Sequence, residues 1–335
     1  MSALKVLYIG GTGTISAACV AESVAAGHEV HVLNRGVSTD RPTPEGVVEH
    51  VGDAHDAAGL RELAEAERFD SIAQFVAFGP EHVAADVAAL TGLTRQYLFI
   101  SSASAYQTPP TSLPVTESTP LRNPFWEYSR KKIACEDVLV AAHRADGFPS
   151  TIVRPSHTYD RTKLPVEGRW GVIKRMREGR PVVVHGDGTS LWTITHAEDF
   201  ARGFVALLGR PEAIGEAFHI TGDEAPTWNR IYSELARAAG VDEPEFVHVP
   251  SDAIAAVDPE WGSALLGDKA HSMVFDNAKL RRLAPDFRAR IPFARGAEEI
   301  VAWFDAHPGA QVVDERLDAL MDRLVEVYRP RALGA

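Results

Sequence analysis

Short apolar runs alternate with longer amphipathic stretches through the first half of the chain. The stretches SAACVAESVAAG (16–27) and HDAAGLRELAEAE (55–67) have the spacing of helices that bury one face. Runs with the length and composition of buried strands lie around and between them, at 6–9, 29–33, 47–51, 71–78, 97–101 and 150–154. This alternation predicts an α/β fold, a doubly wound parallel sheet with helices on both faces.

The pattern changes after about residue 155, where elements become shorter and Pro, Gly and Trp more frequent. The stretch EAFHITG (216–222) nevertheless has the composition of one more strand for the same sheet. The stretch 107–124 carries many turn residues and is long for a connection inside a domain, so we expect a binding loop or lid there. Residues 314–330 form an amphipathic pattern that predicts a helix packed on the core.

The first strand leads into a glycine turn, GGTGTIS at 10–16. Gly10 and Gly13 hold the first two positions of a G-x-x-G-x-x-G spacing, and Ser16 stands at the third. Such a turn lets the backbone approach a pyrophosphate, which then lies at the N-terminus of the following helix, at Thr14 and Ile15. The turn predicts a Rossmann-type dinucleotide site. We therefore expect a dinucleotide-binding domain at 1–155, rejoined by about 190–222, and an interleaved, smaller C-terminal α/β lobe at 156–335 that mainly binds substrate.

The end of the second strand bears on which cofactor is bound. An acidic residue that would hold a ribose 2′-hydroxyl is expected there, but the sequence reads Asn34-Arg35-Gly36. A guanidinium can pair with a 2′-phosphate, so Arg35 favours NADP over NAD, unless it is only a solvated surface arginine. Asp53, just after the third strand, is expected to accept a bond from the adenine amino group, to cap the following helix, or to do both.

Composition narrows the class of partner. The chain of 335 residues carries 34 Lys and Arg against 46 Asp and Glu, a formal net charge of -12, which disfavours nucleic acid. Cys19 and Cys135 lack C-x-x-C spacing and are expected in the core, and no metal site is predicted. With no 18-residue apolar run and no leader-like segment in this sequence, we expect a cytoplasmic protein without membrane contact.

A catalytic set follows the fifth predicted strand. Tyr128 and Lys132 are spaced i, i+4, which on a helix puts both side chains on one face. The ammonium can then lower the phenol pKa and hold a ribose hydroxyl, as suits a general acid/base for hydride transfer. Ser102 stands at a strand end, where its hydroxyl can bond the substrate oxygen as this changes between alcohol and carbonyl.

With these residues the chain resembles the extended short-chain dehydrogenase/reductases of the NAD-dependent epimerase/dehydratase type. The matching segments occur in family order over most of the chain, at 10–16, 100–106, 128–132, 152–160 and 186–203. The resemblance implies Tyr128 as acid/base, Lys132 as its electrostatic partner and ribose anchor, and Ser102 as donor to the substrate oxygen. It also implies cofactor contacts at Ala77, Pro155 and His157, and a homodimer.

The sequence departs from the family pattern at several places. Dehydratases resemble one another in an acid after the catalytic Ser/Thr, where this chain has Ala103 and Ser104, so dehydration is not expected. Trp192 and the leucines of SALLGDKAHSMVFDN (263–277) stand where epimerases carry arginines that clamp a sugar-nucleotide pyrophosphate. This disfavours a nucleoside-diphosphate sugar, unless arginines nearby compensate, and favours a smaller sugar or an uncharged keto substrate. Candidate compensating arginines and pocket residues are Arg169, Arg175, Arg177, Trp126, Trp170, Trp192, Lys269 and His271.

Three functions remain open. The first is an NAD(P)-dependent epimerase or oxidoreductase acting by hydride transfer at a carbinol or carbonyl carbon of a sugar or related polyol. The second is an NADPH-dependent ketoreductase of a natural product or small keto substrate. Arg35 favours net reduction, whereas the family resemblance favours epimerisation. The third, a dinucleotide-binding regulator without catalysis, is disfavoured by the intact Ser102, Tyr128 and Lys132.

Overall fold

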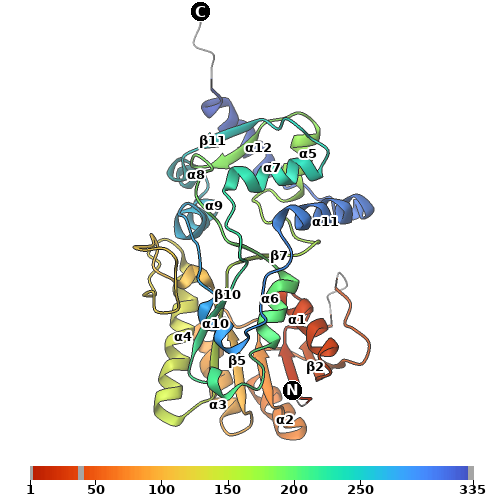
Figure 1. The fold of residues 1–335 in the computed structure, drawn as a ribbon, viewed down its shortest axis with the longest axis vertical. Coiled ribbons are helices and arrows are strands. Elements are labelled where there is room, and N and C mark those ends of the chain that lie inside the picture. The colour runs from red at the N-terminus through yellow and green to blue at the C-terminus, as the bar shows by residue number, and fades with distance from the viewer. Residues whose placement is uncertain (1–2, 37–40, 331–335) are drawn as a thin grey trace, which may run out of the picture.

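A seven-stranded parallel sheet forms the centre of the larger lobe (Figure 1). The computed structural model describes residues 3–36 and 41–330. The strand order is β10-β6-β5-β4-β1-β2-β3, and every neighbouring pair is parallel. The strands are β1 (Lys5–Ile9), β2 (Glu29–Asn34), β3 (Val48–Val51), β4 (Ser71–Gln74), β5 (Gln96–Ile100), β6 (Ser150–Pro155) and β10 (Ala217–Ile220). Each expected strand is confirmed, including the late one near 216–222.

Helices cover both faces of this sheet, because alternate residues of its buried strands point to opposite sides. The helices α1 (Thr14–Ala25) and α6 (Ala197–Val205) pack on one face, where Val6 and Tyr8 of β1 also lie. The opposite face, with Leu7 and Ile9, is covered by α2 (Ala57–Glu67), α3 (Pro80–Leu90) and α4 (Glu127–Asp146). Cys19 and Cys135 are buried in the cores of these two faces, as expected for small core residues.

The smaller lobe has a hydrophobic core of its own. Two short parallel pairs belong to it or connect it to the sheet: β8 (Val182–His185) with β11 (Phe246–Val249), and β7 (His157–Tyr159) with β9 (Ile194–His196). Its helices are α5 (Trp170–Arg177), α7 (Trp228–Ala238), α8 (Ser251–Val257), α9 (Pro259–Ala264), α11 (Phe293–Ala306) and α12 (Glu315–Tyr328). The last of these packs Leu317, Leu320 and Leu324 into the core, as its pattern predicts. The short α10 (Ala278–Leu283) returns to the sheet beside β10.

The stretch 107–124 packs against other parts of the chain. Its Val115 is fully buried and pairs with Phe275, and Leu121 pairs with Tyr106. In the described parts of the chain, no helix is long and apolar enough to cross a membrane.

Candidate active site

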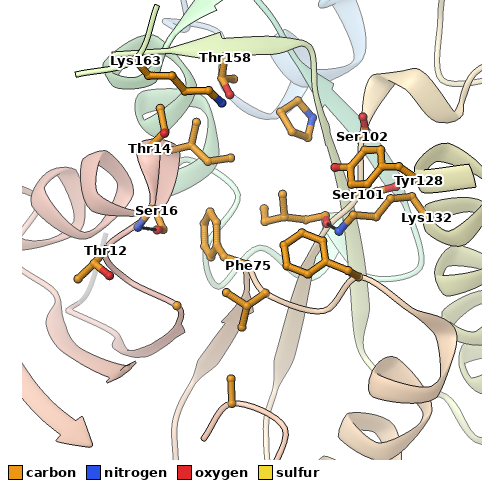
Figure 2. Close-up of a pocket in the computed structure, with 18 of the residues that line it drawn as sticks. Thr12, Thr14, Ser16, Phe75, Ser101, Ser102, Tyr128, Lys132, Thr158 and Lys163 are labelled. Atoms are coloured by element: carbon orange, nitrogen blue, oxygen red, sulfur yellow. Dashed lines mark hydrogen bonds between the residues drawn. The ribbon is translucent and has the colours of Figure 1, made fainter. Parts of the chain in front are cut away.

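A cavity of about 1210 Å³ lies at the carboxyl ends of the sheet strands and extends to residues of the smaller lobe. This is where open parallel sheets bind ligands. Figure 2 shows Thr12, Thr14 and Ser16 on one side of it and Ser102, Tyr128 and Lys132 on the other. The predicted site residues that line it are Gly10, Gly13, Thr14, Ile15, Asn34, Arg35, Asp53, Ser102, Tyr128, Lys132, Pro155 and His157. Ala77 contributes its carbonyl group to this region, as described below.

The glycine turn has the geometry that a dinucleotide requires. Gly10 has φ +85°, and a Cβ there would lie 2.4 Å from Cγ1 of Val76, so a side chain is excluded. Asn34 shapes the turn, because its Oδ1 accepts a hydrogen bond from the Gly11 N–H at 2.9 Å. Ser16 is more than a small substitute for glycine, since its hydroxyl accepts from the Gly13 N–H at 2.8 Å.

Arg35 after β2 and Asp53 after β3 also line the cavity, and both are exposed. Asp53 accepts a hydrogen bond from the His55 N–H, but the N-cap of α2 is Asp56, so the helix-capping alternative for Asp53 is wrong. Arg41 also lines the cavity and escaped the sequence reasoning. Its Nε donates to the Asp160 carboxylate at 2.8 Å, and its guanidinium reaches the Thr14 hydroxyl at 3.4 Å.

These features fit a nicotinamide dinucleotide. Gly10 and Gly11 have no room for side chains, and α1 begins directly after the turn, so the first N–H groups of the helix point back toward the turn. The cavity then continues without interruption to Tyr128 and Lys132. The residues present can therefore hold a pyrophosphate at one end and a nicotinamide riboside near Tyr128.

Ser102 belongs to a chain of three hydroxyl groups. Ser129 donates to the Ser104 hydroxyl at 2.7 Å, and the hydroxyls of Ser104 and Ser102 lie 2.8 Å apart. The Ser104 N–H also donates to Ser102 at 3.2 Å. Either of these two hydroxyls can be the donor, and when Ser104 donates, the Ser102 proton is available to a substrate oxygen. Sequence reasoning treated Ser104 only as a missing acid and did not single out Ser129, one residue after Tyr128.

The electrostatics of Tyr128 differ from expectation. Burial raises the pKa of Tyr128 to about 12, and the nearby Ser102 hydroxyl opposes this shift. The i, i+4 spacing predicts a phenol pKa lowered by Lys132, and that expectation is wrong for the free protein. The reason is geometric, because the Lys132 ammonium lies 5.9 Å from the centre of the Tyr128 ring and donates elsewhere.

Lys132 is almost fully buried and fixed by backbone groups. Its Nζ donates to the carbonyl of Ala77 at 2.8 Å and to that of Ile100 at 2.7 Å. Burial lowers the pKa of Lys132 to about 8. The two carbonyls hold the ammonium at the floor of the cavity, where one N–H remains for a ligand.

A buried ion pair supports the catalytic helix. Glu136 lies one turn after Lys132. Its carboxylate accepts hydrogen bonds from Nε and Nη2 of Arg154 on β6, at 2.9 and 2.5 Å. It also accepts from the hydroxyl of Ser101, the neighbour of Ser102. The pair therefore ties α4, β6 and the end of β5 together directly beneath the catalytic residues.

The cavity is also lined by Trp126, Trp192, Asp268 and Lys269, and by Lys163, which lies on the side of Thr14 and Thr158 (Figure 2). Of the candidate pocket residues, Trp126, Trp192 and Lys269 are therefore in place. Trp170 stacks on Phe304 in the smaller lobe instead.

The candidate compensating arginines do not gather at the cavity. Arg175 is buried and pairs with Asp318 and Asp322, and Arg177 pairs with Asp305. Arg169 lines a separate, smaller pocket in the second lobe. No clamp for a pyrophosphate is thus formed by these three among residues 3–36 and 41–330.

Comparison with known proteins identifies the family of the chain. Residues 6–221 match the family described as NAD dependent epimerase/dehydratase. The chain is 29% identical over 321 residues to 2'-dehydrokanamycin reductase of Streptomyces kanamyceticus, covering 92% of this chain and 89% of that protein. It is also 29% identical over 257 residues to the chloroplast stem-loop binding protein of 41 kDa b of Arabidopsis thaliana, covering 73% of this chain and 65% of that one.

Solved structures share the fold. The dTDP-glucose 4,6-dehydratase of Bacillus anthracis in complex with NAD superposes with a TM-score of 0.74 at 16% identity, over 92% of this chain and 98% of that one. The UDP-glucose 4-epimerase of Thermotoga maritima gives 0.73 at 17% identity, over 90% and 99%. The chain is an enzyme that belongs to the NAD-dependent epimerase/dehydratase family, within the extended short-chain dehydrogenase/reductases.

Proposed function

We propose that this enzyme is an NADP-dependent ketoreductase that transfers hydride to a carbonyl carbon of a sugar or related polyol, with Tyr128 as the general acid. The observation that carries the proposal is the convergence of Ser102, Tyr128 and Lys132 on one wall of the cavity that begins at the glycine turn. Arg35 at the adenosine end favours the cofactor with a 2′-phosphate.

The residues divide the reaction among them. The bound nicotinamide supplies the hydride. Ser102 donates a hydrogen bond to the carbonyl oxygen and holds it beside Tyr128, and Tyr128 gives its proton to that oxygen as negative charge develops there. Lys132, fixed by the carbonyls of Ala77 and Ile100, keeps one N–H with which it would hold the ribose of the cofactor.

Several observations favour a substrate without a nucleoside diphosphate. Trp192 lines the cavity where epimerases of the family carry an arginine, and Arg175 and Arg177 are paired elsewhere. Charge-assisted bonds to a diphosphate contribute roughly 1.5–3 kcal/mol each, so their loss weakens such a ligand strongly. The similarity to a protein named 2'-dehydrokanamycin reductase, which covers most of both chains, supports net reduction.

Epimerisation is the second candidate, because the same three catalytic residues serve it and relatives named as epimerases cover much of the chain. In an epimerase the hydride would return to the opposite face of the substrate. The oxidation state of the cofactor would then be the same before and after a full turnover. The two functions therefore differ in what happens to the cofactor.

The test uses NADPH deuterated at C4 with a panel of keto sugars and keto cyclitols. We expect stoichiometric oxidation of NADPH and deuterium on the product carbinol carbon by mass spectrometry, with neither seen in Tyr128→Phe. NAD that co-purifies tightly, together with epimerised sugars and no net oxidation, would establish the epimerase instead. Tight NADPH binding without turnover of any member of the panel would contradict both the ketoreductase and the epimerase.

A further inference from the structure

The carboxylate of Asp268 is an unusual feature of the cavity. Only 13% of its side chain is exposed, and the residue lines the cavity. Its nearest charged partner is Lys269, whose Nζ lies 3.7 Å away, and the carboxylate accepts no hydrogen bond from any residue in the described ranges 3–36 and 41–330. Its oxygens are not among the completely buried polar atoms that lack a partner, so they remain open to the cavity. A ligand in the cavity can therefore supply the hydrogen-bond donors that the protein does not.

The groups around Asp268 are those that bind a polar ring. Lys269 lies over the ring of Trp126 at 5.4 Å, and the Trp126 and Tyr128 rings are 4.9 Å apart. Asp268 is close enough to Tyr128 for its charge to raise the pKa of that phenol. An acceptor, a cationic donor and an aromatic face are thus gathered beside the residue that would transfer the proton.

The backbone of this segment is held rigidly. Asp268 and Lys269 end a single π-helical turn, Leu265–Lys269. On one side, the Gly267 carbonyl accepts from Asn123 at 2.6 Å. On the other, the Lys269 carbonyl accepts from the ring N–H groups of His185 and Trp228 at 3.2 and 3.1 Å. The carboxylate is therefore placed before a ligand arrives, which reduces the entropy lost on binding.

The space behind this turn is filled. The rings of Trp192 and Trp228 stack at 5.6 Å, and His185 packs edge-on against Trp228 at 4.7 Å. Trp192 and Trp228 are 3% and 1% exposed, so the aromatic cluster leaves no channel through it for a nucleoside. A diphosphate at the cavity face would also meet the Asp268 carboxylate, and like charges repel strongly where water is largely excluded.

We propose that Asp268, Lys269 and Trp126 form a specificity subsite for a polyhydroxylated or amino-substituted ring that carries no nucleoside diphosphate. Asp268 accepts hydrogen bonds from hydroxyl or ammonium groups near the reacting carbon, Lys269 donates to a ring oxygen, and Trp126 covers one face of the ring. The inference rests on the proposed function for the position of the reacting carbon, and it adds the class of substrate.

The test measures binding rather than turnover. The protein is saturated with NADPH, or with NADH if that binds more tightly, and titrated by saturation-transfer NMR with alcohols that cannot be reduced. The probes are methyl α-D-glucopyranoside, its 2-amino-2-deoxy analogue, myo-inositol, UDP-glucose and 1-decalol. We expect at least one of the first three to bind more tightly than UDP-glucose and 1-decalol. Comparison of the two glycosides shows whether hydroxyl or ammonium is preferred.

Asp268→Asn keeps the size and one acceptor but removes the charge. We expect it to weaken binding of the best ring probe about tenfold. Glu260→Gln is the matched control, because it removes one exposed carboxylate of the same lobe outside the cavity, and it should leave binding unchanged. Circular dichroism and thermal unfolding establish that both variants are folded.

Three results would overturn the inference. These are tighter binding of UDP-glucose or 1-decalol than of every ring probe, no binding by any probe, and binding to Asp268→Asn within twofold of the parent protein. The proposed function fails separately. If ring probes bind in an Asp268-dependent way but no keto sugar oxidises NADPH, the subsite stands and the ketoreductase does not.

Discussion

Tyr128 is half-buried, and its phenol keeps its proton over the whole physiological range, since desolvation raises its pKa to about 12. That state suits an acid that gives a proton to a carbonyl oxygen during reduction. Tyr128→Phe should lower kcat about 10²-fold or more while the Kd for NADPH, measured by fluorescence titration, changes less than about twofold. Unchanged turnover would remove Tyr128 from the proposed mechanism.

Arg35 tests the choice of cofactor. Arg35→Ala should weaken NADPH about tenfold or more, since a charge-assisted pair with the 2′-phosphate is lost, and should leave NADH nearly unaffected. Calorimetric titration of the same variant with both cofactors supplies its own control. Equal losses for NADPH and NADH would mean that Arg35 does not contact the 2′-phosphate.

Asp268 also makes stability depend on pH. Burial raises its pKa from 3.8 to about 6, so the folded protein binds this proton more tightly than the unfolded chain. Stability contributed by the neutral form is therefore present below pH 4 and is lost as pH rises to about 6, by on the order of 2–3 kcal/mol. Asp268→Asn avoids this loss.

The measurement is urea unfolding of the parent protein and Asp268→Asn at pH 4.5, 5.5 and 7. The stability advantage of the variant should grow over this series and stop growing above about pH 6.5. An advantage that does not change with pH would show that the carboxyl group titrates near its ordinary pKa.

At the scale of elements, the Glu136–Arg154 pair joins α4 to β6. Glu136→Gln leaves the buried guanidinium of Arg154 without a carboxylate to compensate its charge. We therefore expect this variant to lower the free energy of unfolding by about 3 kcal/mol. Glu127→Gln on the same helix is the control, because Glu127 pairs with Lys131 on the surface, where such pairs contribute less than about 1 kcal/mol. Similar losses in the two variants would argue against a structural role for the pair.

The elements were predictable from the sequence where local pattern decides them. Buried parallel strands such as β1 and β5 appear in the sequence as short apolar runs. The glycine turn predicts where a pyrophosphate would bind. The helix α4 places Tyr128 and Lys132 one turn apart, as the i, i+4 spacing requires on a helix. The substrate class does not follow from such local patterns.

The rest of the site depends on contacts between distant segments. Asp268 is unremarkable in sequence, and its significance comes from facing Tyr128, some 140 residues earlier in the chain. The Ser129–Ser104 bond likewise joins the catalytic helix to the turn after β5. The lowered phenol pKa expected from spacing fails because spacing does not report that two carbonyls hold Lys132.

At the scale of the whole molecule, the enzyme builds one cavity from a sheet lobe and a smaller lobe with separate hydrophobic cores. We propose that the division near residue 155, with 190–222 returning to the sheet lobe, separates cofactor from substrate binding. The homodimer implied by family resemblance stays a prediction, which sedimentation analysis can examine.

One side chain connects the start of α1 to the segment that follows β7. Arg41 contacts Thr14 at the start of α1 and also holds Asp160 and Thr162 beyond β7. A cofactor phosphate near Thr14 would draw on the same guanidinium that positions the segment leading into the substrate lobe. We expect cofactor binding to bear on the position of this segment, and any coupling to substrate binding that results has to be reciprocal, with each ligand changing the affinity of the other by the same factor.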